Sequence, residues 1–427
     1  MKNIFINPSK EKWHEIIQRP HINDAELKNI VANILLDVKQ NGDEAIKKYS
    51  LQFGKVLLDE LKVSDEEVNE AILLIDDELK SAINIAKENI EKFHIAQKEE
   101  EKKIETSKGI WCWRKSVAIE KVGLYIPGGT APLFSTLLML GIPAVVAGCR
   151  EIIVCTPSGT DGSVNPVVLY VARLLGLKNI YKIGGVQAIG AMAYGSESVS
   201  KVYKIFGPGN QYVTCAKQMV NMEGVAIDMP AGPSEVAVYA DESCNASFVA
   251  ADLLSQAEHG VDSNVLLVTM SERIIQDVKK QIDIQIEKLP RKNIAKKALS
   301  KSHFVVVENI DNAFGLLNEY AAEHLIIASD NAKELSKKVI NAGSVFLGHY
   351  SSESIGDYVS GTNHTLPTNG FARAYSGVSL DSFVKKITFQ NVSKKGLINI
   401  GNAVEVMAEA EGLAAHKNAV SIRLKNL

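Results

Sequence analysis

A glutamine and a histidine stand three residues apart near the end of an expected helix, at Gln256 and His259. The helix is expected to begin near Asn245, a residue type that caps helix starts, and to end at Gly260. Residues three apart share one helix face, so the amide oxygen and the imidazole can reach the same cleft. Such oxygen and nitrogen donors suit a borderline cation such as zinc. The open alternative is a histidine that only caps the helix.

Two further clusters combine a carboxylate with an imidazole. Glu323 and His324 come directly before an apolar run at residues 325–327, and adjacent groups of this kind can act as general bases when partly desolvated. Asp357 and His364 lie in a glycine-rich stretch, and loops positioned by a sheet commonly present ligands. A surface dipeptide, an Asx-turn and a solvent-facing histidine remain the alternatives at these positions.

A fourth cluster lies near the end of the sequence, where Glu411 and His416 flank a short stretch of small and apolar residues. The sequence turns polar beyond residue 383 and then helical, which predicts a small C-terminal appendage carrying this cluster. The carboxylate and imidazole are distant in sequence from the other three clusters. A helix-end histidine without function is the alternative interpretation.

Paired glycines provide places where a backbone could approach a phosphate, at 128–129, 184–185 and 207–209. None of these pairs completes the G-x-G-x-x-G pattern, and the sequence has no G-x-x-x-x-G-K-[ST] loop. The residues by themselves therefore allow a dinucleotide without indicating one.

The elements that must position these groups alternate in type after residue 113. Short apolar runs ended by glycine or proline predict buried parallel strands at residues 122–126, 152–156, 179–183, 236–240, 265–269, 304–307 and 325–328. Helical segments separate most of them, which predicts a doubly wound α/β architecture. Earlier, residues 25–40 form an expected amphipathic helix stopped by Gly42. A capping box at Ser64 starts a second helical region, whose charged end at residues 98–103 is expected to be a solvated helix face.

Composition favours a globular protein acting on a small molecule. The 427 residues suggest two or three domains, and the net charge of −3 gives no field for nucleic acid or an anionic membrane. Five scattered cysteines without a C-x-x-C pair argue against a disulfide framework and a thiolate metal site. The longest apolar stretch, at residues 133–148, is too short and interrupted to span a bilayer, and no export signal is visible. We therefore expect a cytoplasmic protein.

The stretch Ile-Asp-Met-Pro-Ala-Gly-Pro-Ser-Glu at residues 227–235, followed by Ser-Gln-Ala-Glu-His at 255–259, resembles the signature of histidinol dehydrogenases. The resemblance extends over nearly the whole chain, through the motifs at residues 123–129, 184–188, 206–210, 323–324 and 411–416. One departure is Tyr239, where an aliphatic residue is usual, and its ring is expected to affect packing and not chemistry.

The resemblance implies a role for each cluster. Zinc, one ion per subunit, would be held by Gln256, His259, Asp357 and His416, with His416 donated by the other subunit of a homodimer that shares its active sites. Glu323 and His324 would carry the proton transfers. Substrate contacts would come from the zinc ligands and His324, and also from Ser234, His364 and Glu411. NAD contacts would come from Tyr125, Gln187 and Asn210.

The fold implied is two doubly wound, incomplete Rossmann-like α/β domains with small helical N- and C-terminal appendages. The expected division is an N-terminal appendage (1–22), a discontinuous first α/β domain with the zinc and substrate site (23–122 and 236–378), a second NAD-binding α/β domain (123–235), and a C-terminal appendage (379–427) that completes the partner's site.

The activity implied is the four-electron oxidation of L-histidinol through L-histidinaldehyde to L-histidine with two NAD, the last step of histidine biosynthesis. Zinc would orient the substrate, His324 would act as base, and Glu323 would help activate water on a retained aldehyde. Two other classes of protein remain open. One is a zinc hydrolase acting on a small ester or amide without NAD, and the other is a non-catalytic dimer in which zinc only joins two chains.

Overall fold

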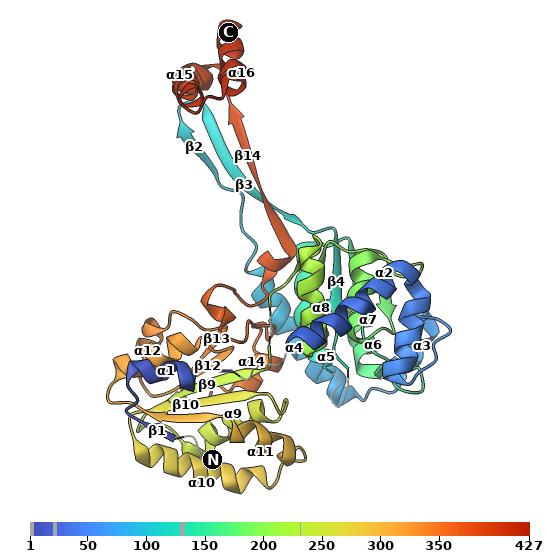
Figure 1. The fold of residues 1–427 in the computed structure, drawn as a ribbon, viewed down its shortest axis with the longest axis vertical. Coiled ribbons are helices and arrows are strands. Elements are labelled where there is room, and N and C mark those ends of the chain that lie inside the picture. The colour runs from blue at the N-terminus through green and yellow to red at the C-terminus, as the bar shows by residue number, and fades with distance from the viewer. Residues whose placement is uncertain (1–3, 20–23, 129–132, 231) are drawn as a thin grey trace.

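A computed structural model describes residues 4–19, 24–128, 133–230 and 232–427. The expected boundary between residues 22 and 23, Gly129 of the glycine pair and Ala231 of the signature stretch lie outside the described residues. The described chain folds into two α/β units, each built on a parallel sheet, and an arm that projects away from both (Figure 1).

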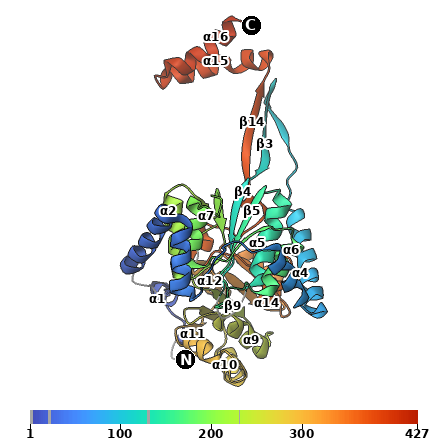
Figure 2. The same ribbon diagram turned by 90° about the vertical axis from the view of Figure 1, so that its right-hand side faces the viewer.

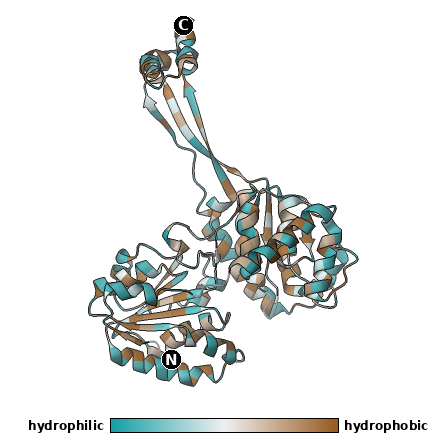
Figure 3. Ribbon diagram, in the orientation of Figure 1, coloured by the Kyte–Doolittle hydropathy of each residue, from teal (hydrophilic) through white to brown (hydrophobic). Residues whose placement is uncertain are grey.

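The six-stranded sheet is parallel throughout. Its spatial order is β1 (Ile4–Ile6), β11 (His303–Val306), β10 (Asn264–Thr269), β9 (Glu235–Ala240), β12 (His324–Ala328) and β13 (Ser344–Leu347). The five-stranded sheet is also parallel, in the order β6 (Asn179–Tyr181), β5 (Glu151–Cys155), β4 (Lys121–Tyr125), β7 (Lys204–Phe206) and β8 (Ala226–Ile227). The strands of both sheets are largely apolar (Figure 3), as strands covered on both faces require.

Both sheets follow the same winding. Counted along the chain from β4 and from β9, the strands lie in the order third, second, first, fourth, fifth, and β1 adds an outer strand beside β11. This is the doubly wound order without its usual sixth strand, so the predicted incomplete Rossmann-like architecture is confirmed. The described part of the N-terminal segment is not a separate appendage, because β1 pairs with β11, and Trp13 and Ile16 enter the core on one face of the sheet.

Helices cover both faces of each sheet. The six-stranded sheet is covered on one face by α9 (Ala246–Ala257), α10 (Glu272–Ile286) and α11 (Lys292–Ser300), and on the other by α1 (Trp13–Ile16), α12 (Ile310–Tyr320) and α13 (Ala332–Leu335). The five-stranded sheet is covered by α2 (Asp24–Gly54), α7 (Gly185–Tyr194) and α8 (Gln211–Met222) on one face, and by α3 (Asp65–Leu73), α4 (Asp77–Ile95), α5 (Phe134–Ala147) and α6 (Pro166–Leu174) on the other. Tyr239 packs against Phe314 inside the first of these units.

The placement of α2, α3 and α4 corrects the expected division of the chain. Residues 23–122 were expected to join residues 236–378, but Val31 and Val38 of α2 share a core with the five-stranded sheet, as does Ile90 of α4. An amphipathic pattern shows that a helix needs an apolar partner surface and does not identify that surface. Residues 24–95 therefore belong to the five-stranded unit.

The arm is an antiparallel sheet with two helices at its tip. β3 (Ile110–Ala118) lies between β2 (Lys103–Ser107) and β14 (Val384–Val392), and α15 (Lys394–Ala410) and α16 (Ala414–Lys425) follow (Figure 1). The C-terminal appendage thus includes strands from residues 103–118. The charged run at residues 98–103 is not a helix face, because α4 ends at Ile95 and β2 begins at Lys103.

The remaining short elements are α14 (Glu353–Tyr358) and four 3-10 helices at Lys10–Lys12, Ser336–Lys338, Phe371–Arg373 and Leu380–Phe383. All five cysteines lie among the described residues and are free thiols. Within that part of the chain, no helix combines the length and the apolar character needed to cross a membrane.

Candidate active site

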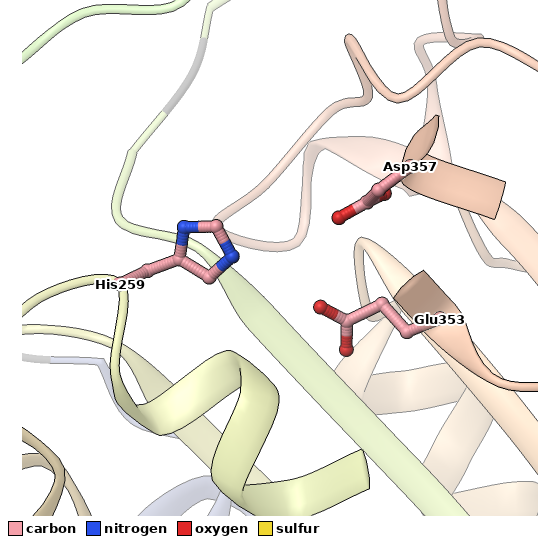
Figure 4. A group of neighbouring side chains, drawn as sticks. All are labelled: His259, Glu353 and Asp357. Carbon is pink, nitrogen blue, oxygen red and sulfur yellow. The ribbon is translucent and has the colours of Figure 1, made fainter. Parts of the chain in front are cut away.

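Two helix ends bring an imidazole and two carboxylates together. His259 follows α9, which is capped by Asn245, since that side chain accepts a hydrogen bond from Ser247 N–H, as the sequence predicts for a helix cap. Glu353 and Asp357 are four residues apart and therefore lie on one face of α14. Ligand atoms of the three side chains lie within 4.8 Å of one another and point toward a common centre (Figure 4).

Gln256 joins this group from the last turn of α9. Its side chain is buried, and its amide orientation is set by its neighbours. In the orientation that satisfies them, the amide nitrogen donates to Glu353 Oε2 over 3.1 Å and the oxygen accepts from Glu235 N–H over 2.9 Å. The predicted pair of Gln256 and His259 is thus brought to one place, together with the predicted Asp357.

Glu323 and His324 lie in the turn after α12 and at the first residue of β12. Glu323 Oε2 accepts a hydrogen bond of 2.9 Å from Glu235 N–H, and it lies 3.6 Å from His324 Nδ1. The same Nδ1 lies 3.3 Å from the Glu235 carbonyl oxygen, and His324 Nε2 lies 3.3 Å from Asp357 Oδ1. A carbonyl oxygen only accepts, so the Nδ1 of a neutral His324 carries the proton and Nε2 is the basic nitrogen that faces Asp357.

Burial and mutual charge shift the titration of these groups. Burial raises the pKa of Glu323 to about 8, against the opposing effect of His324. Burial alone would lower the pKa of His324, but the carboxylates of Glu323, Glu353 and Asp357 raise it to about 10. Burial and the neighbouring carboxylates raise the pKa of Glu353 well above its ordinary value. The pocket therefore holds three carboxyl groups, and the single positive charge of a protonated His324 cannot balance the negative charge of all three.

A metal ion fits this pocket on the chemistry of its donors. Gln256, His259 and Asp357 offer one nitrogen and two oxygens, a mixture that suits zinc. Two buried atoms, His324 Nε2 and Asp357 Oδ1, have no hydrogen-bond partner among the described residues. Buried polar atoms normally have partners, so these two atoms mark a place for a bound group. A cation there would also balance the surplus of carboxylates.

His364 extends the cluster toward the other unit. Its Nδ1 lies 3.0 Å from the Asp357 carbonyl oxygen, and its Nε2 lies 3.3 Å from the hydroxyl of Thr136 in α5. The adjacent Asn363 donates to the Met139 carbonyl of the same helix over 2.6 Å. Ser234 directly precedes Glu235 and is partly buried. The candidate site thus lies where the amino ends of β9 and β12 meet the helix that follows β4.

The proposed NAD contacts lie at the carboxyl end of the five-stranded sheet. Tyr125 ends β4, and its hydroxyl accepts a hydrogen bond of 3.1 Å from Gly185 N–H. Gln187 and Asn210 line a groove of about 1050 Å³ beside Gly185. The Asn210 oxygen caps α8, so a cofactor would meet its amide nitrogen. Carboxyl ends of doubly wound strands are where such sheets bind dinucleotides.

One glycine in this region has a steric requirement. A Cβ at Gly207 would lie 2.1 Å from the Tyr125 carbonyl oxygen, and its φ of +129° disfavours other residues. The loop that leads to Asn210 can therefore pass against the end of β4 only with glycine at this position.

Glu411 and His416 are not brought to this cluster within one chain. Glu411 follows α15, His416 lies in α16, and both side chains are exposed at the tip of the arm. The arm holds them far from α9 and α14 in both views (Figures 1 and 2). If these two residues act at a site of this kind, that site belongs to another copy of the chain.

The comparisons with known proteins agree with this architecture. A family model described as histidinol dehydrogenase matches residues 17–424. The chain belongs to the histidinol dehydrogenase family. A histidinol dehydrogenase from Bacteroides thetaiotaomicron is 58% identical over 427 residues, covering 100% of both chains, and one from Mannheimia succiniciproducens is 49% identical over 99% of each. A crystal structure of histidinol dehydrogenase from Elizabethkingia anophelis has a TM-score of 0.97 and 56% identity, covering 99% of this chain and 98% of that one.

Membership of the histidinol dehydrogenase family confirms the resemblance recognised in the sequence motifs. Sequence reasoning missed Glu353, which is buried against Gln256 and completes the cluster with His259 and Asp357. The available signal was its spacing of four residues from Asp357, which places both on one helix face. That signal is weak, since two acidic residues four apart usually share a solvated face.

Proposed function

We propose that this chain oxidises histidinol through histidinaldehyde to histidine, using zinc and two NAD per turnover. The observation that carries the proposal is the meeting of Glu323 and His324 with the His259 and Asp357 donors, in a chain that matches the histidinol dehydrogenase family over residues 17–424. The overall change removes two hydrides from the substrate and adds the oxygen of one water.

Gln256, His259 and Asp357 would hold the zinc ion, with the fourth ligand from His416 of the partner subunit. When bound, zinc would serve as a template for the nitrogens of histidinol and, by its charge, lower the pKa of His324 towards the range that a base needs. The mixed nitrogen and oxygen donor set and the unpartnered Asp357 Oδ1 support this assignment.

His324 would remove the proton from the alcohol in the first oxidation. Its Nδ1 is directed at the Glu235 carbonyl oxygen, which fixes the ring tautomer with Nε2 as the proton acceptor. Nε2 is buried and lacks a hydrogen-bond partner in the described part of the chain, and it faces Asp357 Oδ1 at 3.3 Å, so it would act on a substrate hydroxyl placed beside the proposed metal ligand.

Glu323 would act in the second oxidation, which consumes water. Its carboxylate is held by Glu235 N–H at one oxygen, and burial raises its pKa to about 8, close to the range where a general base works near neutral pH. It would take a proton from water as the water adds to the aldehyde. Enclosure of the aldehyde between the two units would protect it from side reactions.

Tyr125, Gln187 and Asn210 would contact NAD, which accepts the hydride in each step. The groove beside Gln187 and Asn210 and its position at the carboxyl ends of the strands support this placement. Ser234, His364 and Glu411 would contact the substrate. Glu411 and His416 would come from a second copy, so the working form would be a homodimer with shared sites.

The stoichiometry of NADH tests the proposal. Purified protein with histidinol should yield about two NADH for each histidine, because two hydride transfers flank one retained aldehyde. Absorbance at the NADH band measures the NADH formed, and chromatography of the amino acid products measures the histidine formed. One NADH with free aldehyde would remove the second oxidation from the proposal. No NADH at all would favour the zinc hydrolase or the non-catalytic zinc-linked dimer.

Removal of the metal provides a second test. Dialysis against a chelator should abolish turnover, and stoichiometric zinc should restore it, because without a metal held by Gln256, His259 and Asp357 the substrate would no longer be oriented. Metal content measured by atomic emission alongside the activity links the two effects. Full turnover by protein verified to be free of metal would overturn the ligand assignment.

A further inference from the structure

The main chain of one residue contacts three groups of the candidate site. Glu235 N–H donates to Glu323 Oε2 over 2.9 Å and to the amide oxygen of Gln256 over 2.9 Å, as a shared hydrogen bond. The Glu235 carbonyl oxygen lies 3.3 Å from His324 Nδ1. Any shift of this peptide would therefore move the carboxylate, the imidazole and a ligand amide together.

The side chain of Glu235 is itself held by a buried ion pair. Arg19 donates to both carboxylate oxygens, from Nε over 2.9 Å and from Nη2 over 2.8 Å, and Asn369 N–H adds a third hydrogen bond of 2.8 Å. The exposed fractions of the Arg19 and Glu235 side chains are 11% and 1%. Bidentate pairing of this kind fixes geometry as well as charge.

Arg19 also contacts the helix end that leads to the proposed catalytic pair. Its Nη2 donates to the Tyr320 carbonyl oxygen over 2.7 Å, and the guanidinium lies 4.0 Å from the centre of the Tyr320 ring. Tyr320 ends α12, and the next residue, Ala321, has a φ of +52°, a left-handed conformation that is unfavourable for alanine. Glu323 follows two residues later. One guanidinium thus joins the start of β9 to the strained turn before β12.

We propose that Arg19 and Glu235 form a positioning pair, which holds the Glu235 peptide and the turn after Tyr320 in the geometry that Glu323 and His324 need. The inference rests on the proposed function for the roles of Glu323 and His324. Arg19 comes from the N-terminal segment, 216 residues before Glu235, so this segment is assigned a part in catalysis.

Stability alone does not account for the pair. Taking two charges out of water is costly, and apolar side chains of similar size often replace such pairs without loss of stability. The N-terminal segment already has apolar anchors, because Trp13 and Ile16 are buried in the core on the α12 face of the six-stranded sheet. The ion pair instead fixes the orientation of the Glu235 peptide, which contacts Glu323, Gln256 and His324.

The test compares Arg19→Met with Ile16→Ala in the full-length, zinc-loaded protein. Arg19→Met should lower kcat about tenfold to a hundredfold, the effect expected when catalytic groups are slightly misplaced, with the KM for histidinol and the zinc content changed less than about twofold. Ile16→Ala removes buried apolar volume from the same segment, so it should lower Tm and leave the kcat of the folded protein unchanged.

Two further measurements separate positioning from folding. Millimolar guanidinium ion should restore part of the kcat of Arg19→Met and should not affect Ile16→Ala, because it can reoccupy the site between Glu235 and the Tyr320 carbonyl. Arg19→Lys, which keeps the charge and loses the bidentate contact, should have an intermediate kcat, and it remains informative if Arg19→Met does not fold.

The inference is wrong if Arg19→Met and Arg19→Lys keep the full kcat, or if guanidinium ion fails to restore any of it. Glu323→Gln and His324→Asn, assayed in parallel, show which idea has failed. If those variants lose activity and the Arg19 variants do not, the positioning pair alone is refuted. If they too keep full activity, the proposed function itself is at fault.

Discussion

Replacing Glu323 with glutamine is expected to slow the oxidation of supplied histidinaldehyde about 10²-fold to 10⁴-fold, the usual contribution of a general base. The first oxidation of histidinol should be slowed much less, because it consumes no water. Glutamine can still accept the hydrogen bond from Glu235 N–H, so the change removes the basic oxygen and preserves the local structure. Single-turnover formation of NADH from each substrate measures the two steps separately.

His324→Asn is the matched variant for this experiment. Asparagine can keep a donor toward the Glu235 carbonyl oxygen, but it has no basic nitrogen in the place of Nε2. Both oxidations should therefore slow, with the zinc content unchanged. Equal losses in both steps for Glu323→Gln would contradict its assignment to water activation, and loss of zinc from His324→Asn would make His324 a ligand.

Much of the fold follows from local patterns because fully buried parallel strands are continuous apolar runs. The runs at residues 236–240 and 265–269 correspond to β9 and β10, and the glycine predicted to stop the first long helix, Gly42, is where α2 breaks with a φ of +48°. By contrast, β13 has only three consecutive apolar residues and β8 has only two residues, so neither provides an apolar run long enough to predict a strand.

The sheet of the arm could not be predicted because the pairing of its strands is not local. β14 pairs with β3 from Val384 with Ala118 to Val392 with Ile110, and most of its side chains are exposed. No periodicity within either segment identifies the other as its partner. The same limit explains the wrong assignment of residues 24–95, since the apolar faces of α2 and α4 are visible in the sequence and the sheet they cover is not.

The candidate site, like the fold, could be predicted from the sequence only where a single element sets the spacing of its residues. Gln256 and His259 were predicted to act together because the distance between them is set by a single helix. The approach of His324 Nε2 to Asp357 Oδ1, at 3.3 Å, depends on the packing of β12 against α14 and could be expected only from the family resemblance. The hydrogen bonds from Arg19 to Glu235 correspond to no local sequence pattern, because they join the N-terminal segment to a residue 216 positions away.

Mixing two inactive variants is expected to restore activity if the arm completes the site of a second chain. His259→Asn removes a proposed metal ligand from the pocket, and His416→Asn removes the proposed ligand at the tip of the arm. In a mixed dimer with crossed arms, one site carries both changes and the other has an intact pocket and an intact arm. Random mixing in equal amounts should therefore restore about a quarter of the wild-type activity, since half of the dimers are mixed and each has one complete site.

The opposite arrangement predicts no recovery. If each arm folded back to its own pocket, every site in the mixed dimer would lack either His259 or His416, and no mixing ratio would exceed the activity of the separate variants. The extended position of α15 and α16, away from α9 and α14, favours the crossed arrangement (Figure 1). Native mass spectrometry of differently tagged subunits must first establish that mixed dimers form. Mixed dimers without activity would then refute the shared site, whereas recovery would assign His416 to the partner's metal.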